Sequence, residues 1–244
     1  MADAEPTAPN SSTTTTAVPA DAWSLSRPRL LVSLLLGGAV IAGVYSGPPV
    51  DEVAGIDLRW GLTGPVAGDP WKWLGAGLLV AVALRVERLG TSSLLLRRPG
   101  GRDLEWVLYA FGIVMAWSWL IGTLAPQQDN EGVATVAALG LAGALVLIVT
   151  AAVTEEVVYR GFLAERLGAL LGRRAGARWL GAAASLAIFT GPHLVFFGPS
   201  WLLHQLPGTL AVAAVAAVRR NLPAAMALHL LINLPILIPV AAAS

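Results

Sequence analysis

Long apolar stretches alternate with short polar segments along most of the chain. We place the apolar stretches near residues 29–47, 71–87, 104–124, 134–158, 179–197, 201–218 and 222–242. A helix of about 20 apolar residues crosses a hydrocarbon core of about 30 Å. Because backbone groups in lipid must be hydrogen-bonded internally, such stretches form helices. The pattern predicts an all-α fold, a multi-pass transmembrane bundle of about seven helices. The range is six to eight, because the second and sixth stretches are short.

The N-terminal segment differs from the rest of the chain. Residues 1–28 are rich in Ala, Thr, Ser and Pro and lack apolar periodicity, which predicts a disordered tail. The first apolar run begins near Leu30, too late for a signal peptide. Since no later polar break is long enough for a soluble domain, we expect residues 29–243 to form one membrane domain.

Composition agrees with a membrane protein and excludes several functions. Hydrophobic residues make up 56% of the chain and charged residues 13%, whereas a soluble domain carries about 25% charged residues. The formal net charge of +1 gives no reason to expect a nucleic-acid partner. The absence of cysteine excludes disulfides, zinc–thiolate sites and a cysteine nucleophile. The sequence leaves the oligomeric state open.

Basic residues predict the orientation of the bundle. With the N-terminus inside, the outer segments contain only Arg59 and Lys72, and the inner segments contain thirteen basic residues. The inner set is Arg27, Arg29, Arg85, Arg88, Arg97, Arg98, Arg102, Arg166, Arg173, Arg174, Arg178, Arg219 and Arg220. Such a bias predicts a cytoplasmic N-terminus. We expect an integral protein of a prokaryotic cell membrane, with the lipid bilayer as its surroundings.

Two adjacent glutamates and an arginine follow the fourth apolar stretch. Glu156 and Arg160 are four residues apart with the glutamate first, the favourable order for an ion pair within a helix. Glu155 is rotated by about 100° from Glu156 and lacks that partner at ideal spacing. A carboxylate balanced between burial and a nearby cation is a candidate general base. On this stretch alone, an alternative is that both glutamates are solvated at the cytoplasmic interface.

Two further apolar stretches carry polar residues at helical spacing. The fifth contains Phe189 and His193, with Gly191 and Pro192 indicating a kink, and the seventh contains His229 and Asn233. Each pair has a structural alternative, because a single histidine or asparagine often only bridges packed helices. Together with the glutamates they supply a carboxylate to activate water, imidazoles to transfer protons or bind metal, and an amide for an oxyanion.

These residues form three motifs that resemble those of a known family. E-E-x-x-x-R at 155–160, continuing as G-F-L, is followed by F-x-x-x-H at 189–193 and H-x-x-x-N at 229–233. The set is similar to the CPBP intramembrane proteases, which include the CAAX prenyl endopeptidases and bacteriocin-immunity proteins. The resemblance covers a core at about 130–243, between whose helices the active site is expected. Tyr159 departs from the family pattern, which often has Phe there.

The resemblance implies an intramembrane endopeptidase that hydrolyses a peptide bond of a membrane-associated protein or peptide. Glu155 would activate the water, supported by Glu156 and Arg160, with His193 acting on the same water. His229 and Asn233 would stabilise the oxyanion. The substrate would be a peptide or protein. Because the family includes the CAAX prenyl endopeptidases, lipidated substrates belong to the class to be considered.

Metal dependence stays open at this stage. The family has been described both as metalloproteases and as metal-independent glutamic proteases. Zinc held by Glu155, His193 and His229 fits the mixed ligation that zinc accepts, although the chain lacks the H-E-x-x-H spacing.

Two other functions and one geometric conflict accompany this hypothesis. The polar residues could instead form the structural network of a non-proteolytic scaffold or immunity protein, or the relay of a proton-coupled transporter. The conflict is that Glu155 is placed near the cytoplasmic side while His193 lies fourteen residues beyond Trp179. At about 1.5 Å per residue, the depth mismatch is roughly 15–20 Å. We expect the fourth helix to sit deeper, with Arg160 inside the membrane, rather than the fifth to break at Gly191 and Pro192.

Overall fold

The computed structural model of the chain describes residues 21–45, 52–53, 56–57, 66, 68–126, 131–172, 174 and 176–243. Apart from one small hairpin, in which β1 (Glu52–Val53) pairs antiparallel with β2 (Ile56–Asp57), the regular structure of these residues is helical. Four helices are long and apolar enough to cross a membrane: Arg27–Val44, Gly101–Leu124, Gly140–Leu170 and Ala177–Phe197. The predicted multi-pass helical bundle is confirmed.

The predicted apolar stretches coincide with helices, several of which are divided. The first three correspond to α1 (Arg27–Tyr45), to α2 (Asp69–Ala81) continued by η3 (Val82–Val86), and to α3 (Gly101–Leu124). A short turn, η4 (Thr91–Leu94), precedes α3. The fifth is α7 (Ala177–Phe197), which contains Pro192 without ending there.

The last two stretches are interrupted. The sixth is split into α8 (Trp201–His204) and α9 (Leu206–Arg219). The seventh is split into α10 (Leu222–Asn233), η6 (Leu234–Ile236) and α11 (Leu237–Ala243). Pro235 lies in η6 and has no amide hydrogen to continue the α-helical ladder.

The fourth stretch extends much further than the expected residues 134–158. A separate helix, α4 (Glu131–Ala137), precedes Gly140, whose φ of +66° breaks the chain direction. From there α5 (Gly140–Thr150), η5 (Ala151–Leu163) and α6 (Ala164–Leu170) form one continuous helix of 31 residues. This helix continues past Arg160 by two to three turns, so the E-E-x-x-x-R motif lies inside it.

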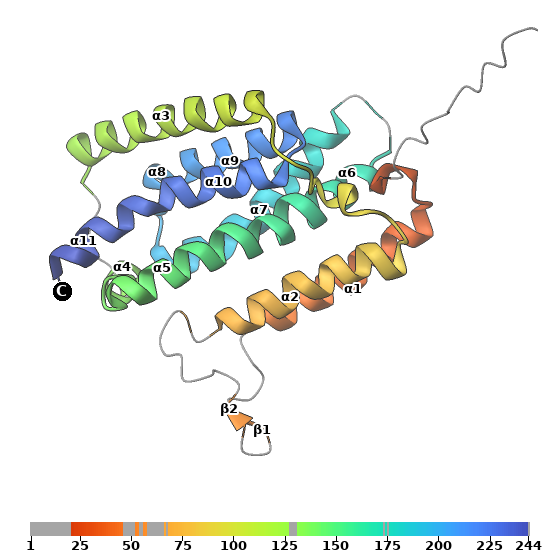
Figure 1. The fold of residues 1–244 in the computed structure, drawn as a ribbon, viewed down its shortest axis with the longest axis horizontal. Helices are drawn as coiled ribbons and strands as arrows, with labels where there is room; N and C mark the ends of the chain where they lie inside the picture. The colour runs from red at the N-terminus through yellow and green to blue at the C-terminus, as the bar shows by residue number, and fades with distance from the viewer. Residues whose placement is uncertain are drawn as a thin grey trace, which may run out of the picture.

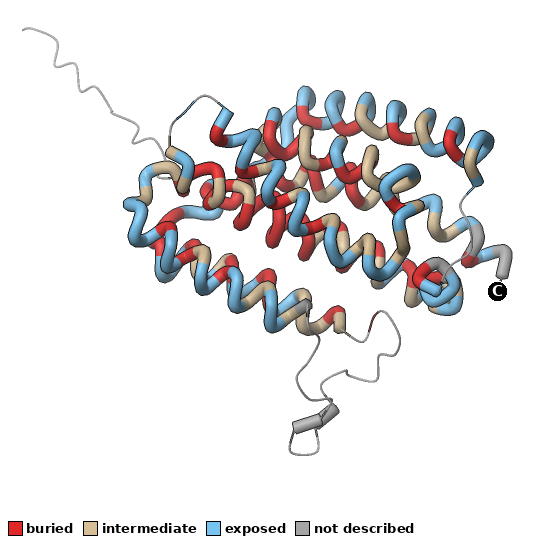
Figure 2. Tube along the Cα trace, turned by 180° about the vertical axis from the view of Figure 1, so that it is seen from behind, coloured by how far each residue is buried: buried red, intermediate tan, exposed pale blue. Residues whose placement is uncertain are grey.

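The long helix runs through the middle of the bundle. In Figure 1, α3 lies on one side and the α1–α2 pair on the other, with α5, α7, α9 and α10 between them. Segment η5 packs against α2, α7 and α10. Its Val158 and Phe162 join Phe189 and Trp201 in the largest buried apolar cluster. Figure 2 shows buried positions concentrated in the middle of the bundle and many exposed positions on its outer helices.

Helices α6 and α7 are in backbone contact at two glycines. A Cβ atom at Gly181 would lie 2.4 Å from the backbone nitrogen of Gly168. Gly168 in turn lies beneath the ring of Trp23, where a Cβ would be 3.2 Å from the indole. Glycine is therefore required for this approach, which fixes α7 against the end of the long helix.

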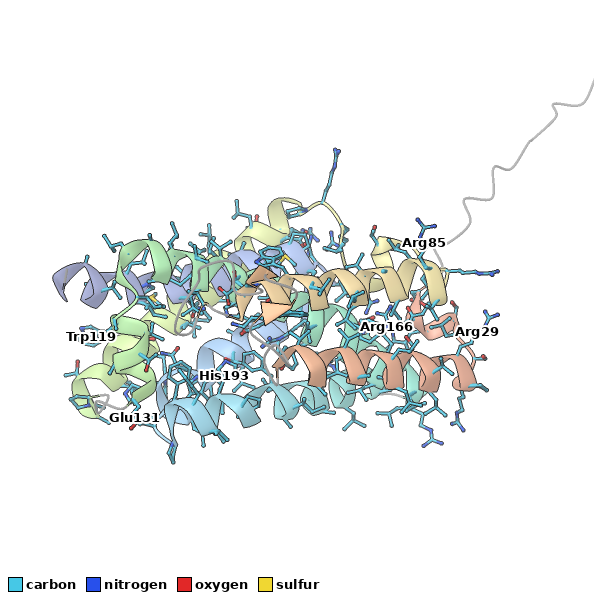
Figure 3. The ribbon with its side chains drawn as sticks, turned by 90° about the horizontal axis from the view of Figure 1, so that it is seen from below. Arg29, Arg85, Trp119, Glu131, Arg166 and His193 are labelled. Atoms are coloured by element: carbon cyan, nitrogen blue, oxygen red, sulfur yellow. The ribbon has the colours of Figure 1, made fainter. Side chains whose placement is uncertain are left out.

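Arginines gather at one end of the bundle, which we call the arginine-rich end. Figure 3 shows Arg29, Arg85 and Arg166 toward this end, and Trp119 and Glu131 toward the opposite end. Arg166, which the sequence assigns to the inner segments, lies in α6 at this end, and its side chain is fully buried. It donates to Glu87 Oε1 at 3.0 Å and to the Ser93 carbonyl at 2.9 Å, and Ser33 also donates to Glu87.

The predicted tail also needs correction at its end. Residues 21–28 are ordered: Ala22–Ser24 form the turn η1, and α1 begins at Arg27. Ala22 is fully buried, and the indole of Trp23 donates to Glu165 at 3.3 Å. Residues 1–20 of the predicted tail lie outside the described residues.

Candidate active site

The central helix changes its hydrogen-bond register at the predicted catalytic motif. Residues 151–163 form a π-helix, in which bonds run from i to i+5. In this wider register both Glu155 and Glu156 lie one turn before Arg160, rather than Glu156 alone. Glu155, Glu156 and Arg160 are 7%, 0% and 5% exposed. The alternative that both glutamates are solvated at an interface is therefore wrong.

Glu156 is the centre of a buried ionic cluster. Its Oε1 lies 3.0 Å from Arg160 Nη1 and 2.8 Å from His229 Nδ1. A buried carboxylate is costly unless it is paired and hydrogen-bonded, and Glu156 meets both conditions through Oε1. Its Oε2 is buried without a hydrogen-bond partner. The favourable i, i+4 pair expected from the sequence is thus present and is extended to α10.

His229 connects the two glutamates. Its Nδ1 faces Glu156, and its Nε2 lies 3.9 Å from Glu155 Oε2. With Nδ1 donating to the Glu156 carboxylate, a neutral imidazole has its lone pair on Nε2. A carboxylate that fixes the tautomer and orientation of a histidine is the arrangement found in hydrolytic triads. His229 is thereby prepared to exchange a proton beside Glu155.

Phe189 places the second motif next to the first. Its ring centroid lies 4.5 Å from the guanidinium carbon of Arg160 and 4.2 Å from the imidazole centroid of His193. His193 Nδ1 is 2.8 Å from the Phe189 carbonyl oxygen. Since a carbonyl only accepts, Nδ1 donates and Nε2 of neutral His193 can accept a proton. Figure 3 shows His193 between the two ends of the bundle.

The structure joins most, but not all, of the predicted site residues. Glu155, Glu156, Arg160, His229 and, through Phe189, His193 are linked by the contacts above. The contacts described for this chain include none between His193 and Glu155, so their joint action on water stays a prediction. Asn233 is the last residue of α10, one turn beyond His229, and is partly exposed. Its amide has no hydrogen-bond partner among the described residues.

The predicted zinc ligands do not converge. Within the part of the chain that the structure describes, no three His, Cys, Asp or Glu side chains are grouped closely enough to hold a metal ion. Glu155 and His229 are near neighbours, but His193 directs Nδ1 to its own helix and lies among aromatic rings. These side chains as placed do not fit a three-ligand zinc site.

The central helix continues to Leu170, and its Arg160 meets α7 through Phe189. Helix α7 does not break at Gly191 and Pro192, so the alternative of a broken fifth helix is wrong. The greater depth of the fourth helix in the membrane stays a prediction.

Other side chains at the site carry no signal in the three motifs. Trp201 is buried, and its ring lies 5.0 Å from the ring of His193. Ser185 donates to the Tyr159 carbonyl at 2.6 Å and ties α7 to η5. His204 Nε2 lies 2.9 Å from the Ala125 carbonyl at the end of α3.

Comparison with known proteins adds one finding. A family model described as Type II CAAX prenyl endopeptidase Rce1-like matches residues 136–235. The match contains all six predicted site residues, and the predicted resemblance to the CPBP and CAAX protease family is confirmed over this segment. Neither the curated proteins nor the solved structures compared with this chain include a match.

Proposed function

We propose that this integral membrane protein is an intramembrane endopeptidase that hydrolyses a peptide bond of a membrane-associated protein or peptide. The observation that carries the proposal is the buried cluster in which His229 lies between Glu156 and Glu155. It supports a hydrolytic site because a base, an oriented histidine and a fixed counter-ion meet inside a segment similar to a peptidase family.

In this proposal Glu155 is the general base. It takes a proton from water as the water oxygen adds to the scissile carbonyl carbon, which leaves a tetrahedral oxyanion. When the C–N bond breaks, the proton on Glu155 passes to the leaving nitrogen, either directly or through Nε2 of His229. Glu156 acts through His229, because its Oε1 holds Nδ1 and leaves Nε2 facing the reaction, and Arg160 is the counter-ion of Glu156.

Two other residues complete the proposed site. The amide of Asn233, and Nε2 of His229 once it has taken the proton from Glu155, are donors for the oxyanion, as the family resemblance implies. His193, with Nδ1 engaged by a carbonyl, offers Nε2 as a second acceptor for the water. Burial of Glu155 and His229 strengthens the electrostatic interactions that they make.

The bilayer setting and the orientation belong to the same proposal. The apolar outer faces of α1, α3 and α7 would contact lipid, and the arginine-rich end would face the cytoplasm. A substrate that reaches a site enclosed by these helices is expected to be membrane-associated, with a lipidated peptide as one member of that class.

The test is peptide cleavage by purified protein in proteoliposomes, with a mixture of membrane-anchored peptides, prenylated and unmodified, read by mass spectrometry. We expect cleavage by the wild type and none above background by Glu155→Gln, which keeps the shape of the side chain. A matched control is Glu131→Gln, an exposed residue of α4, which should retain wild-type activity. Equal cleavage by wild type and Glu155→Gln would contradict the role of Glu155 as the base, and no cleavage above background by either protein would favour a scaffold role.

A further inference from the structure

Asp69, at the start of α2, is a buried carboxylate outside the three motifs and outside the segment matched by the family. It is 2% exposed. Its Oδ1 accepts from Lys72 Nζ at 2.9 Å, whereas its Oδ2 is buried and has no hydrogen-bond partner. A buried, unpartnered carboxylate oxygen costs free energy unless it serves a ligand or a water.

The first turns of α2 are fixed against the helix turn that precedes Glu155. The indole of Trp73, one turn after Asp69, donates to Thr150 Oγ1 at 3.1 Å. Thr154 donates to the Thr150 carbonyl at 2.8 Å, so both threonines are held in place. On its other side α2 meets α1 closely, since a Cβ at Gly75 would lie 2.5 Å from Val44.

This packing brings Asp69 within electrostatic reach of Glu155. The Thr150 hydroxyl lies within hydrogen-bonding reach of the Asp69 carboxylate, and in the π register Thr150 is one turn before Glu155. Glu155 therefore lies between two groups from different helices: Asp69 on the α2 side and His229, 3.9 Å away, on the α10 side. The N-terminal half of the chain thus contributes a polar group to the candidate site.

A charge count shows which atoms are left available there. Lys72 neutralises Asp69, and Arg160 neutralises Glu156. Among the described residues, the acceptors there without a hydrogen-bond partner are the carboxylate of Glu155, Oδ2 of Asp69 and Oε2 of Glu156, whose other oxygen is bound to His229. A water molecule has two hydrogens to donate, so one water can satisfy Glu155 and Asp69 Oδ2 together.

We propose that Asp69 positions the attacking water. In the ground state the water donates one hydrogen to Glu155 and the other to Asp69 Oδ2, which leaves an oxygen lone pair for the carbonyl carbon. Only the proton on the Glu155 side is transferred when the C–O bond forms. The hydrogen bond to Asp69 stays intact and keeps the water in one orientation. This inference rests on the proposed endopeptidase function.

The competing explanation is that Asp69 is structural. A carboxylate in the first turn of a helix, paired with a lysine three residues later, stabilises that helix without touching a reaction. A structural role predicts a change in the stability of the protein, whereas a water-positioning role predicts a change in kcat, the rate at which bound substrate is cleaved.

Two substitutions separate these roles. Asp69→Asn retains an oxygen for Lys72 but replaces the second acceptor with a donor, while Asp69→Glu keeps two acceptors. Both would be compared with Glu155→Gln and with the exposed control Glu131→Gln, by peptide cleavage at saturating and limiting substrate and by thermal unfolding. We expect Asp69→Asn to lower kcat by about 100-fold with KM within about twofold of the wild type. The kcat of Asp69→Glu should be at least tenfold higher than that of Asp69→Asn.

The outcomes test the water-positioning role of Asp69 separately from the proposed endopeptidase function. If Glu155→Gln abolishes cleavage while Asp69→Asn has wild-type kcat, the water-positioning role is wrong and the endopeptidase stands. If Asp69→Asn and Asp69→Glu unfold equally early and are equally slow, the structural role is correct. If wild type and Glu155→Gln cleave alike, the role of Glu155 as the base fails first.

Discussion

The imidazole of His229 and the carboxylate of Glu156 are 2.8 Å apart, and they come from different helices. This pair joins α10 to η5 at the depth of Glu155, and it gives His229 a defined tautomer. Glu156 Oε1 also meets Arg160, so one oxygen organises two of the three predicted motifs.

Replacement of Glu156 by glutamine should therefore impair catalysis more than binding. A Gln amide can present its nitrogen to His229, which would reverse the tautomer, and it leaves Arg160 buried without a counter-charge. We expect kcat to fall by about 100-fold or more with KM little changed. Steady-state cleavage kinetics in proteoliposomes provide the measurement. A kcat within twofold of the wild type would show that the orientation of His229 does not matter.

The buried pair of Glu87 and Arg166 makes a prediction about stability. The arginine is fully buried and bonds to Glu87, Ser93 and Gly161. Removing one partner leaves the other charge buried, so Arg166→Met alone should destabilise the protein by about 3–5 kcal/mol. Replacing both residues with methionine should cost much less.

A double-mutant cycle measured by unfolding in detergent tests this expectation, with the exposed Arg98→Met as the control. Additive effects of the two single substitutions would indicate that the ion pair does not link η3 to α6.

The glycine contact between α6 and α7 predicts opposite effects of the same substitution at two sites. A methyl group at Gly181 would meet the backbone of Gly168 and Ala164 at 2.4–2.6 Å. Gly181→Ala should therefore cost about 1–3 kcal/mol and displace the helix that carries His193. At Gly112 of α3 nothing lies within 4 Å, and alanine there should stabilise by about 0.5–1 kcal/mol. Thermal unfolding of the two variants checks the sign, and a tolerated Gly181→Ala would mean that the helices are further apart.

Hydropathy predicted the helices well because segment length and apolar content determine whether a helix can span lipid. The motifs also predicted that Glu155, Glu156, Arg160 and His229 lie together, and these four are buried, whereas His193 and Asn233 are partly exposed. The boundaries of the fourth helix were harder, since Arg160 and Arg166 look like the start of a polar loop. Arg160 pairs with Glu156, which in turn binds His229 of a distant helix, and Arg166 pairs with the distant Glu87.

Side-chain geometry was the least predictable part of the site. An α-helical spacing assigns Arg160 to Glu156, whereas the π register also brings Glu155 one turn before it. Trp201 and Asp69 belong to no motif, and their places beside His193 and within electrostatic reach of Glu155 follow from packing of helices distant in sequence.

Isotope labelling tests the central claim, that Glu155 activates a water to hydrolyse a peptide bond, most directly. Cleavage would be run in water enriched in oxygen-18, and the new carboxyl terminus would be analysed by mass spectrometry. The wild type should place one labelled oxygen in each product carboxylate, and Glu155→Gln should yield no labelled product above background. Cleavage that proceeds without incorporation of the label, or labelled product formed equally by Glu155→Gln, would contradict the account.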